Sequence, residues 1–167
     1  MSTVKTNNLQ IGQSATATNN FTLYQPSTPD GTVRLGVGNA GATTAELISF
    51  SSSGLFAFNS GYGSVATVYG CRAWVNFNGT GVVAIRASGN VSSITDGGVG
   101  IYTVNYTTAM PDTNYAAVVN ASRAATDFTV FSSRGSVTQT TAGVTLVTGT
   151  TAFALADADN IYVAIFR

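Results

Sequence analysis

The chain of 167 residues is long enough for one sizeable domain, or for one domain with a small appendage. Charged residues make up 8% of it, seven basic side chains balance seven acidic ones, and histidine is absent. Without net charge there is no field to attract a polyanion, which argues against nucleic-acid binding. So few charges also do little to oppose self-association. We therefore expect part of the surface to face copies of the chain or a larger assembly.

The composition also narrows the possible chemistry. Without histidine the chain lacks the commonest general base, the usual serine and cysteine triads, and the ligands of most zinc sites. The one cysteine, Cys71, excludes an intrachain disulfide, and we expect it to pack as a small buried apolar residue. The polar N-terminus is not a signal peptide, and no stretch approaches the roughly 18 apolar residues of a membrane span. These features predict a protein made in the cytoplasm, without membrane insertion.

Residues 1–54 are predicted to form a small β-rich N-terminal region. A short strand is expected within residues 8–12, and Phe21 and Leu23 alternate with Thr22 and Tyr24 at the strand period of two. The phrase "PDGT" at residues 29–32 is a turn signal, because proline fixes φ and glycine tolerates positive φ. Alternation resumes over residues 33–37, breaks at "GNAG", and a further strand is expected over residues 45–50.

Residues 55–61 are interpreted as a joint that leads into a C-terminal domain at residues 62–167, because serine and glycine are frequent there. Leu55, Phe56 and Phe58 are nevertheless expected to pack against something. In the domain that follows, Ala73, Val75 and Phe77 share one face of a predicted strand.

Two hairpin turns are expected in the C-terminal domain, at Asn78-Gly79 and at Asp96-Gly97-Gly98. Tyr102, Val104 and Tyr106 share a face of one later strand. Ile161, Val163 and Ile165 share a face of the last strand, opposite Tyr162, Ala164 and Phe166. Strand-sized segments with turn signals every 8 to 12 residues or so predict an all-β fold, an antiparallel β-sandwich or jelly-roll-like domain. The apolar last strand is expected to be docked in a sheet, either as an inner strand of a monomer or covered by a neighbouring subunit.

The carboxylates offer weak candidates for chemistry. Asp30, Asp96 and Asp112 all lie in turn signals, where an aspartate caps its own turn through backbone hydrogen bonds. Asp157 and Asp159 in "DADN" can offer oxygen ligands to a cation, but the later glycine and glutamate of a calcium loop are missing, and a polar turn is the preferred interpretation. "GVGNAG" at residues 36–41 matches the letters of a dinucleotide loop without a following helix, so we expect no nucleotide cofactor.

Aromatic residues among Thr, Ser and Asn can form shallow sugar platforms, because rings stack on sugar C–H faces while amides bind hydroxyls. The same residues also fill β cores and subunit interfaces. The candidates are Tyr62, Tyr69, Trp74, Tyr102, Tyr106, Tyr115 and Tyr162.

Several phrases resemble those of short virion proteins of tailed bacteriophages, especially marine and cyanobacterial ones. "FTLYQPSTPDGT" followed by "GNAGAT" is similar to their N-terminal segment, and "RAWVNFNGTG", "IRASGNVSSITD" and "TTAMPDTNY" are similar to a tail-fibre module. The resemblance implies a trimeric, non-enzymatic virion component without cofactors, with a distal β domain and an N-terminal part that docks on the particle. The attachment residues it suggests are Phe21, Leu23, Tyr24, Pro29, Asp30, Gly31 and Leu35.

A short tail fibre or knob that contacts the host surface, with glycans as the candidate receptor, is the leading hypothesis. A capsid-decorating protein, a head fibre, or a neck or tail connector without receptor binding is the alternative. A polysaccharide-degrading tail enzyme would need two carboxylates about 5 to 10 Å apart, drawn from Asp30, Asp96, Asp112, Asp127, Asp157 and Asp159. A non-viral sugar-binding β-sandwich is the remaining candidate. The phrase "TTAMPDTNY" at residues 107–115 is interpreted as a scaffold corner in which Pro111 starts the turn and Asp112 caps it.

Overall fold

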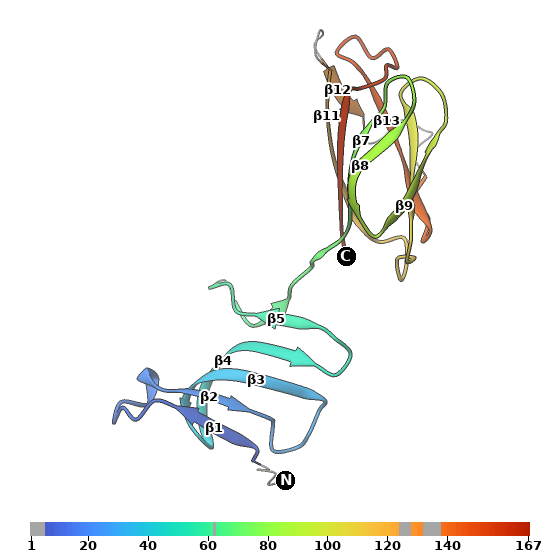
Figure 1. Cartoon of the computed structure of the whole chain (residues 1–167). Coiled ribbons are helices and arrows are strands. Elements are labelled where there is room, and N and C mark those ends of the chain that lie inside the picture. The colour runs from blue at the N-terminus through green and yellow to red at the C-terminus, as the bar shows by residue number, and fades with distance from the viewer. Residues whose placement is uncertain (1–5, 62, 124–127, 132–137) are drawn as a thin grey trace. The chain divides into compact units, whose positions relative to one another are not determined.

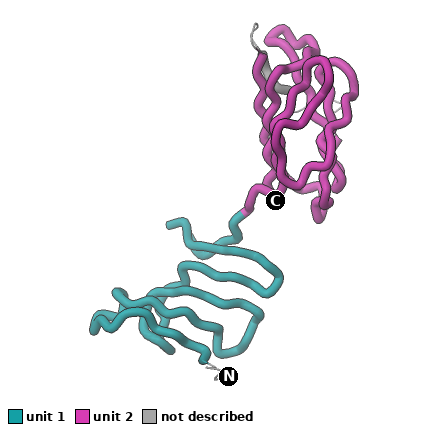
Figure 2. Tube along the Cα trace, viewed as in Figure 1, with its two compact units in different colours: residues 1–68 teal, residues 69–167 magenta. Residues whose placement is uncertain are grey.

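The computed structural model describes residues 6–61, 63–123, 128–131 and 138–167. The chain divides into two compact units, unit 1 at residues 1–68 and unit 2 at residues 69–167 (Figure 2). The predicted all-β, antiparallel class is confirmed: every strand pair is antiparallel, and the described stretches contain a single 3-10 turn, Ala17–Asn19, but no α-helix. Within those stretches no helix is long and apolar enough to cross a membrane.

Unit 1 is a six-stranded sheet in which each strand pairs with its neighbours in sequence (Figure 1). The turn at Pro29–Thr32 joins the second and third strands, as the sequence predicts. The segment expected as a joint contributes a strand to this sheet, and the unit boundary follows at Val68. The strands are β1 (Asn8–Ile11), β2 (Phe21–Tyr24), β3 (Thr32–Asn39), β4 (Ala42–Ser51), β5 (Phe56–Phe58) and β6 (Ala66–Thr67).

Unit 2 contains two four-stranded sheets, with strand orders β12-β13-β10-β9 and β11-β14-β7-β8. The two predicted hairpins are confirmed, because β7 pairs with β8 after Asn78 and β9 pairs with β10 around Gly97. The strands are β7 (Cys71–Asn78), β8 (Ala84–Gly89), β9 (Val91–Asp96), β10 (Ile101–Tyr106), β11 (Ala116–Ser122), β12 (Phe128–Phe131), β13 (Gly143–Thr150) and β14 (Asn160–Phe166).

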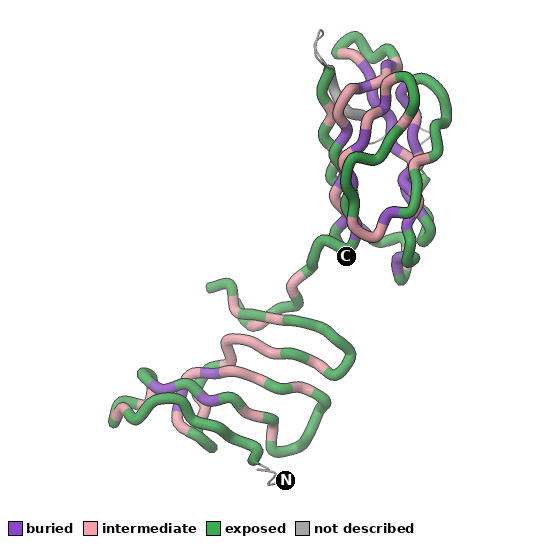
Figure 3. The backbone as a smooth tube through the Cα atoms, viewed as in Figure 1, coloured by how far each residue is buried: buried purple, intermediate pink, exposed green. Residues whose placement is uncertain are grey.

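Both sheets of unit 2 contribute to one apolar core (Figure 3). The residues that alternation placed together on one face of β7, β10 and β14 are all buried. The Phe77 and Tyr102 rings meet edge to face across the sheets, with centroids 5.3 Å apart. The residues on these buried faces are Ala73, Val75, Phe77, Tyr102, Val104, Tyr106, Ile161, Val163 and Ile165.

The last strand is docked in a sheet, as expected, and it is an inner strand of that sheet because β14 pairs with β11 on one side and β7 on the other. The prediction for Cys71 is wrong, because this residue is exposed. Cys71 has the same parity as Ala73, but the register shifts at this end of β7, so that Phe166 pairs with Cys71 while Ile165 pairs with Ala73. This irregularity places Cys71 beyond the edge of the core.

Two tyrosines hold loops of unit 2 against the core. The buried Tyr102 hydroxyl lies 2.8 Å from Asp157 Oδ1 and 2.9 Å from the Gly79 carbonyl oxygen, and so links two loops. The Tyr115 hydroxyl lies 3.0 Å from the carbonyl oxygens of Thr140 and Gly143. Tyr115 directly precedes β11 and packs against the Tyr106 ring. The corner at residues 107–115 is therefore tied to β13, as a scaffold element would be.

Candidate interaction surfaces

The predicted attachment residues fall on both faces of the unit 1 sheet. Leu23 pairs with Leu35, and Phe21 precedes Leu23 by two residues, so these three share one face. Tyr24 pairs with Arg34 on the opposite face. Pro29, Asp30 and Gly31 lie in the β2–β3 turn, where the Asp30 carboxylate accepts hydrogen bonds from the Thr32 hydroxyl and backbone N–H. The segment thus contributes to two different surfaces and a turn.

One face of this sheet is apolar across five strands. The pairing register aligns Leu9, Leu23, Leu35, Ile48 and Phe58 in one row. In the adjoining row the Phe50 ring stacks on the Phe56 ring at a centroid distance of 5.0 Å. We define the apolar face as the eight large side chains that are 38% to 58% exposed here, namely Leu9, Ile11, Phe21, Leu23, Val33, Phe50, Phe56 and Phe58.

Burial in unit 1 is inverted relative to an ordinary soluble domain, in which large apolar residues are inside. Among the described residues of unit 1, the buried ones are Asn20, Thr22, Gly36 and Gly38. The Asn20 side chain is held by Ser14 and Asn39, and the Thr22 hydroxyl donates to the Gly38 carbonyl at 2.8 Å. Figure 3 shows that unit 1 is mainly exposed or half-buried. This unit therefore has no apolar core of its own.

The charged groups of unit 1 that the structure describes gather on the opposite face. The Arg34 guanidinium contacts the Asp30 carboxylate and lies 2.8 Å from Glu46 Oε2. Hydrogen bonds from Thr32 and Arg34 hold the pKa of the Asp30 carboxyl below its usual value. A shallow polar hollow of about 530 Å³ lies on this face, lined by residues that include Arg34, Glu46 and Thr67. We call this side of the sheet the polar face.

In unit 2, the outward side of the sheet β11-β14-β7-β8 carries exposed aromatic rings. Trp74 and Tyr162 alternate with buried neighbours and are 44% and 45% exposed. Trp74 pairs with Ala164, and Tyr162 pairs with Asn76 and Asn120 on its two sides. The two rings are therefore diagonal neighbours, within reach of a common ligand. We define the Trp74 face as Trp74, Asn76, Val118, Asn120 and Tyr162.

The Trp74 indole lies close to the backbone of the adjacent strand. A Cβ added to Gly89 would be 2.5 Å from the Trp74 Nε1 and 2.9 Å from Cδ1, so glycine is needed beneath the ring. The cross-strand neighbours of Trp74, Gly89 on one side and Ala164 on the other, are small and therefore leave its ring exposed. Arg86 donates to Asn76 Oδ1 at 3.4 Å and to the Asp159 carbonyl at 2.7 Å, which positions the Asn76 amide.

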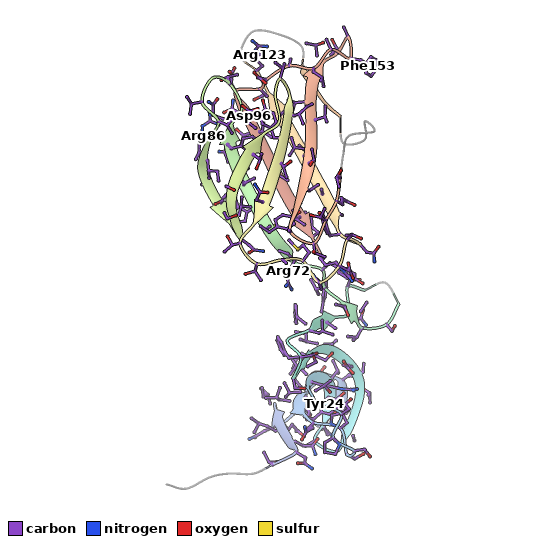
Figure 4. The ribbon with its side chains drawn as sticks, turned by 90° about the vertical axis from the view of Figure 1, so that its right-hand side faces the viewer. Tyr24, Arg72, Arg86, Asp96, Arg123 and Phe153 are labelled. Atoms are coloured by element: carbon purple, nitrogen blue, oxygen red, sulfur yellow. The ribbon has the colours of Figure 1, made fainter. Side chains whose placement is uncertain are left out.

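A further exposed region lies at one end of unit 2. Figure 4 places Arg123 and Phe153 at the end opposite Arg72. Phe153 is 69% exposed and has a φ of +62°, uncommon for a bulky residue. The directions of the strands place the β7–β8 and β9–β10 loops at this same end of unit 2. Each loop carries one exposed valine, Val82 in the first and Val99 in the second.

The described aspartates are engaged in holding loops. Asp96 Oδ1 accepts from the Gly98 N–H at 2.9 Å, which confirms the predicted turn cap. Asp157 Oδ1 accepts from the Gly100 N–H at 2.7 Å and from the Tyr102 hydroxyl, whereas Asp159 Oδ1 contacts the Thr80 hydroxyl at 3.3 Å. Residues 6–61, 63–123, 128–131 and 138–167 contain no group of three or more His, Cys, Asp and Glu side chains that could hold a metal ion. Asp127 and Tyr62 lie outside the described residues.

Sequence reasoning suggested Trp74 and Tyr162 as platform candidates but did not separate them from the other tyrosines. The structure assigns Tyr102, Tyr106 and Tyr115 to the core and leaves Tyr69, Trp74 and Tyr162 exposed. Comparison with known proteins adds no relative: no protein-family model, curated protein or solved structure matches this chain.

Proposed function

We propose that this chain is a non-enzymatic structural protein of a bacteriophage virion. In this proposal it is a trimeric short tail fibre or knob, attached to the particle by its N-terminal unit. Its C-terminal unit, a β-sandwich of jelly-roll type, contacts the host surface through a neutral carbohydrate. The observation that carries the binding role is the Trp74 face, where two exposed rings are flanked by amides. The phrases that resemble phage fibre modules support the virion context.

The chemistry of the Trp74 face suits a neutral sugar. The apolar C–H face of a pyranose stacks on a flat ring, and Trp74 offers the larger of the two rings. The amides of Asn76 and Asn120 supply donors and acceptors for hydroxyl groups. No carboxylate belongs to this face as defined, and the Arg86 guanidinium that contacts Asn76 also donates to the Asp159 carbonyl, so it is engaged within the protein.

Trp74 is the only tryptophan, so its fluorescence reports on this face directly. The purified chain would be screened on an array of neutral oligosaccharides, and hits would be titrated while the Trp74 emission is followed. We expect a saturable change in emission and staining of candidate host cells by labelled protein. The proposed binding role fails if no oligosaccharide is retained and no cell is stained.

Two truncations separate the Trp74 face from the loop end of unit 2. Trp74→Ala should weaken retention on the array by at least about tenfold, because a central aromatic contact contributes more than about 1.4 kcal/mol. Phe153→Ala, which removes a still more exposed ring, should leave retention unchanged. The opposite pattern would contradict the assignment of binding to the Trp74 face. Circular dichroism would confirm that both variants fold.

The second candidate is a capsid-decorating protein, head fibre, or neck or tail connector without receptor binding. The uncovered apolar face of unit 1 favours this candidate, because such a surface is explained by contact with assembly partners and does not require a host receptor. A chain that self-associates but binds neither the array nor cells would favour this role.

A further inference from the structure

We propose that the apolar face of unit 1 is the surface through which copies of this chain assemble, packed against the same face of the other copies. The inference rests on the self-association in the proposed function and goes further by naming the surface. It also reassigns Phe21, Leu23 and Leu35 from attachment to the particle to contact between chains. Tyr24 and the Asp30–Arg34–Glu46 cluster remain on the polar face.

Unit 1 lacks the covering layer that would make its sheet stable alone. A sheet becomes stable by burying one face against another layer, and this sheet has none within its own unit. Its four buried positions are two glycines, Asn20 and Thr22, whereas the eight large side chains of the apolar face are 38% to 58% exposed. The covering layer must therefore come from outside the unit.

The exposed area of the apolar face is large for the surface of a single chain. With a full area on the order of 200 Å² for each large apolar residue, the exposed fractions of the eight side chains amount to roughly 700 Å². The largest apolar patch of a typical monomer is about 300 to 600 Å². A standard stable interface buries about 800 Å² on each partner. The apolar face thus exceeds a normal surface patch and approaches what a stable interface needs.

The chemistry of the apolar face favours further copies of this chain as its partner. A surface that replaces a missing core must be covered as the chain folds, and further copies of the same chain are present whenever it is made. The face contains no charged side chain, since the described charges of unit 1 lie on the polar face and its turn, so like faces meet without repulsion. A hollow of about 330 Å³ lined by residues that include Leu9, Leu23 and Val33 can receive side chains from a neighbour.

Two charge substitutions on the apolar face test the proposal against a matched control. Leu23→Asp and Phe50→Asp each place one carboxylate at an exposed position of the face. Thr67→Asp places the same charge on an exposed residue whose partner Ala57 lies on the other side of the sheet from Phe56 and Phe58. In light scattering, the first two variants should fall to the mass of one chain while Thr67→Asp keeps the mass of the assembly. Retention of the assembled mass by all three variants would overturn the proposal.

Hydroxyl-radical footprinting of the unmodified full chain gives a readout that does not depend on how a variant folds. In a single chain, Phe50 is 52% exposed and Phe153 is 69% exposed, so the two rings would oxidise at similar rates. The proposal expects oxidation of Phe50 at least about fivefold slower than that of Phe153, because the core of an interface excludes solvent. Similar rates would overturn it.

The outcomes also separate this inference from the proposed function. Protection of Phe50 without any carbohydrate or cell binding keeps the assembly surface and removes the receptor role. Carbohydrate binding by a single chain with an unprotected Phe50 keeps the receptor role and removes the assembly surface.

Discussion

The carboxylate of Asp112 and the guanidinium of Arg167 form a two-point ion pair that ties the β10–β11 corner to the last residue of the chain. Arg167 Nη2 lies 2.6 Å from Asp112 Oδ2, and Arg167 Nε lies 3.1 Å from Oδ1. Asp112 Oδ1 also accepts from the Asn114 N–H at 2.8 Å, as a turn cap does. The corner that the sequence predicted as scaffold is thus held at two points. Tyr115 ties it to β13, and Arg167 ties it to the end of β14.

Asp112→Ala removes the turn cap and one partner of this ion pair. Because both groups are on the surface, we expect a modest fall in Tm, on the order of 2 °C. Carbohydrate retention should not change, since neither residue belongs to the Trp74 face. Differential scanning calorimetry and the array measure the two effects. A variant with an unchanged Tm but no binding would show that Asp112 acts in recognition rather than in the scaffold.

The same ion pair predicts an acid dependence of stability. Hydrogen bonds from Arg167 and the Asn114 N–H lower the pKa of Asp112 from its ordinary value of 3.8. Its stabilisation is therefore present above pH 3.8 and is lost as pH falls through the lower, folded-state pKa. Thermal melts of the wild type and Asp112→Asn should converge as pH falls from 3.8 through the lowered pKa of Asp112. An unchanged Tm difference down to pH 2 would contradict this assignment.

A pair of tyrosine-to-phenylalanine variants tests the polar link between the loops of unit 2. Tyr102→Phe removes a hydroxyl that contacts Asp157 and Gly79 and leaves these acceptors without it, so we expect a loss of about 1 to 3 kcal/mol in unfolding free energy. The control is Tyr106→Phe, because among the described residues the buried Tyr106 hydroxyl has no hydrogen-bond partner. That change should be close to neutral. Equal losses in urea denaturation would contradict the proposed link.

Tyr102 also predicts an alkaline limit to stability. Burial, together with the hydrogen bond to Asp157, raises the pKa of the Tyr102 hydroxyl above its ordinary value of 10. The neutral form is thus favoured in the folded protein, and the stability it contributes is complete below pH 10 and declines as pH rises above this value. Urea midpoints should fall above pH 10 less steeply for Tyr102→Phe than for the wild type. Parallel slopes would contradict a role for this hydroxyl.

Cys71 provides a test of the corrected end of β7. The residue is exposed, with Sγ 3.3 Å from the Ala73 carbonyl oxygen. A thiol reagent such as DTNB should therefore modify one thiol per chain in the native protein, without denaturant. Modification only after unfolding would restore the buried position that the sequence suggested.

Alternation was sufficient to predict which side chains of β7, β10 and β14 share a face, because the strand period fixes the face that each residue occupies, but it did not say which face is inward. The burial expected for Cys71 came from the usual packing of a lone cysteine, and it failed because a register irregularity at a strand end has no signature in the local pattern. The Asp112–Arg167 pair and the Tyr102–Asp157 contact each join residues 55 positions apart, and such pairing is decided by topology. For unit 1, alternation placed Phe21 and Leu23 on one face, but a pattern says nothing of whether that face is covered.

The mass of the purified full chain in solution tests the central claim most directly. Light scattering over a wide concentration range should give three times the 17.1 kDa of one chain, with no dissociation at low micromolar concentration. A stable species of two chains, or of more than three, would retain the assembly surface but revise the number of copies. A well-behaved single chain at tens of micromolar would contradict the account, because the apolar face of unit 1 would then be exposed to water without a partner.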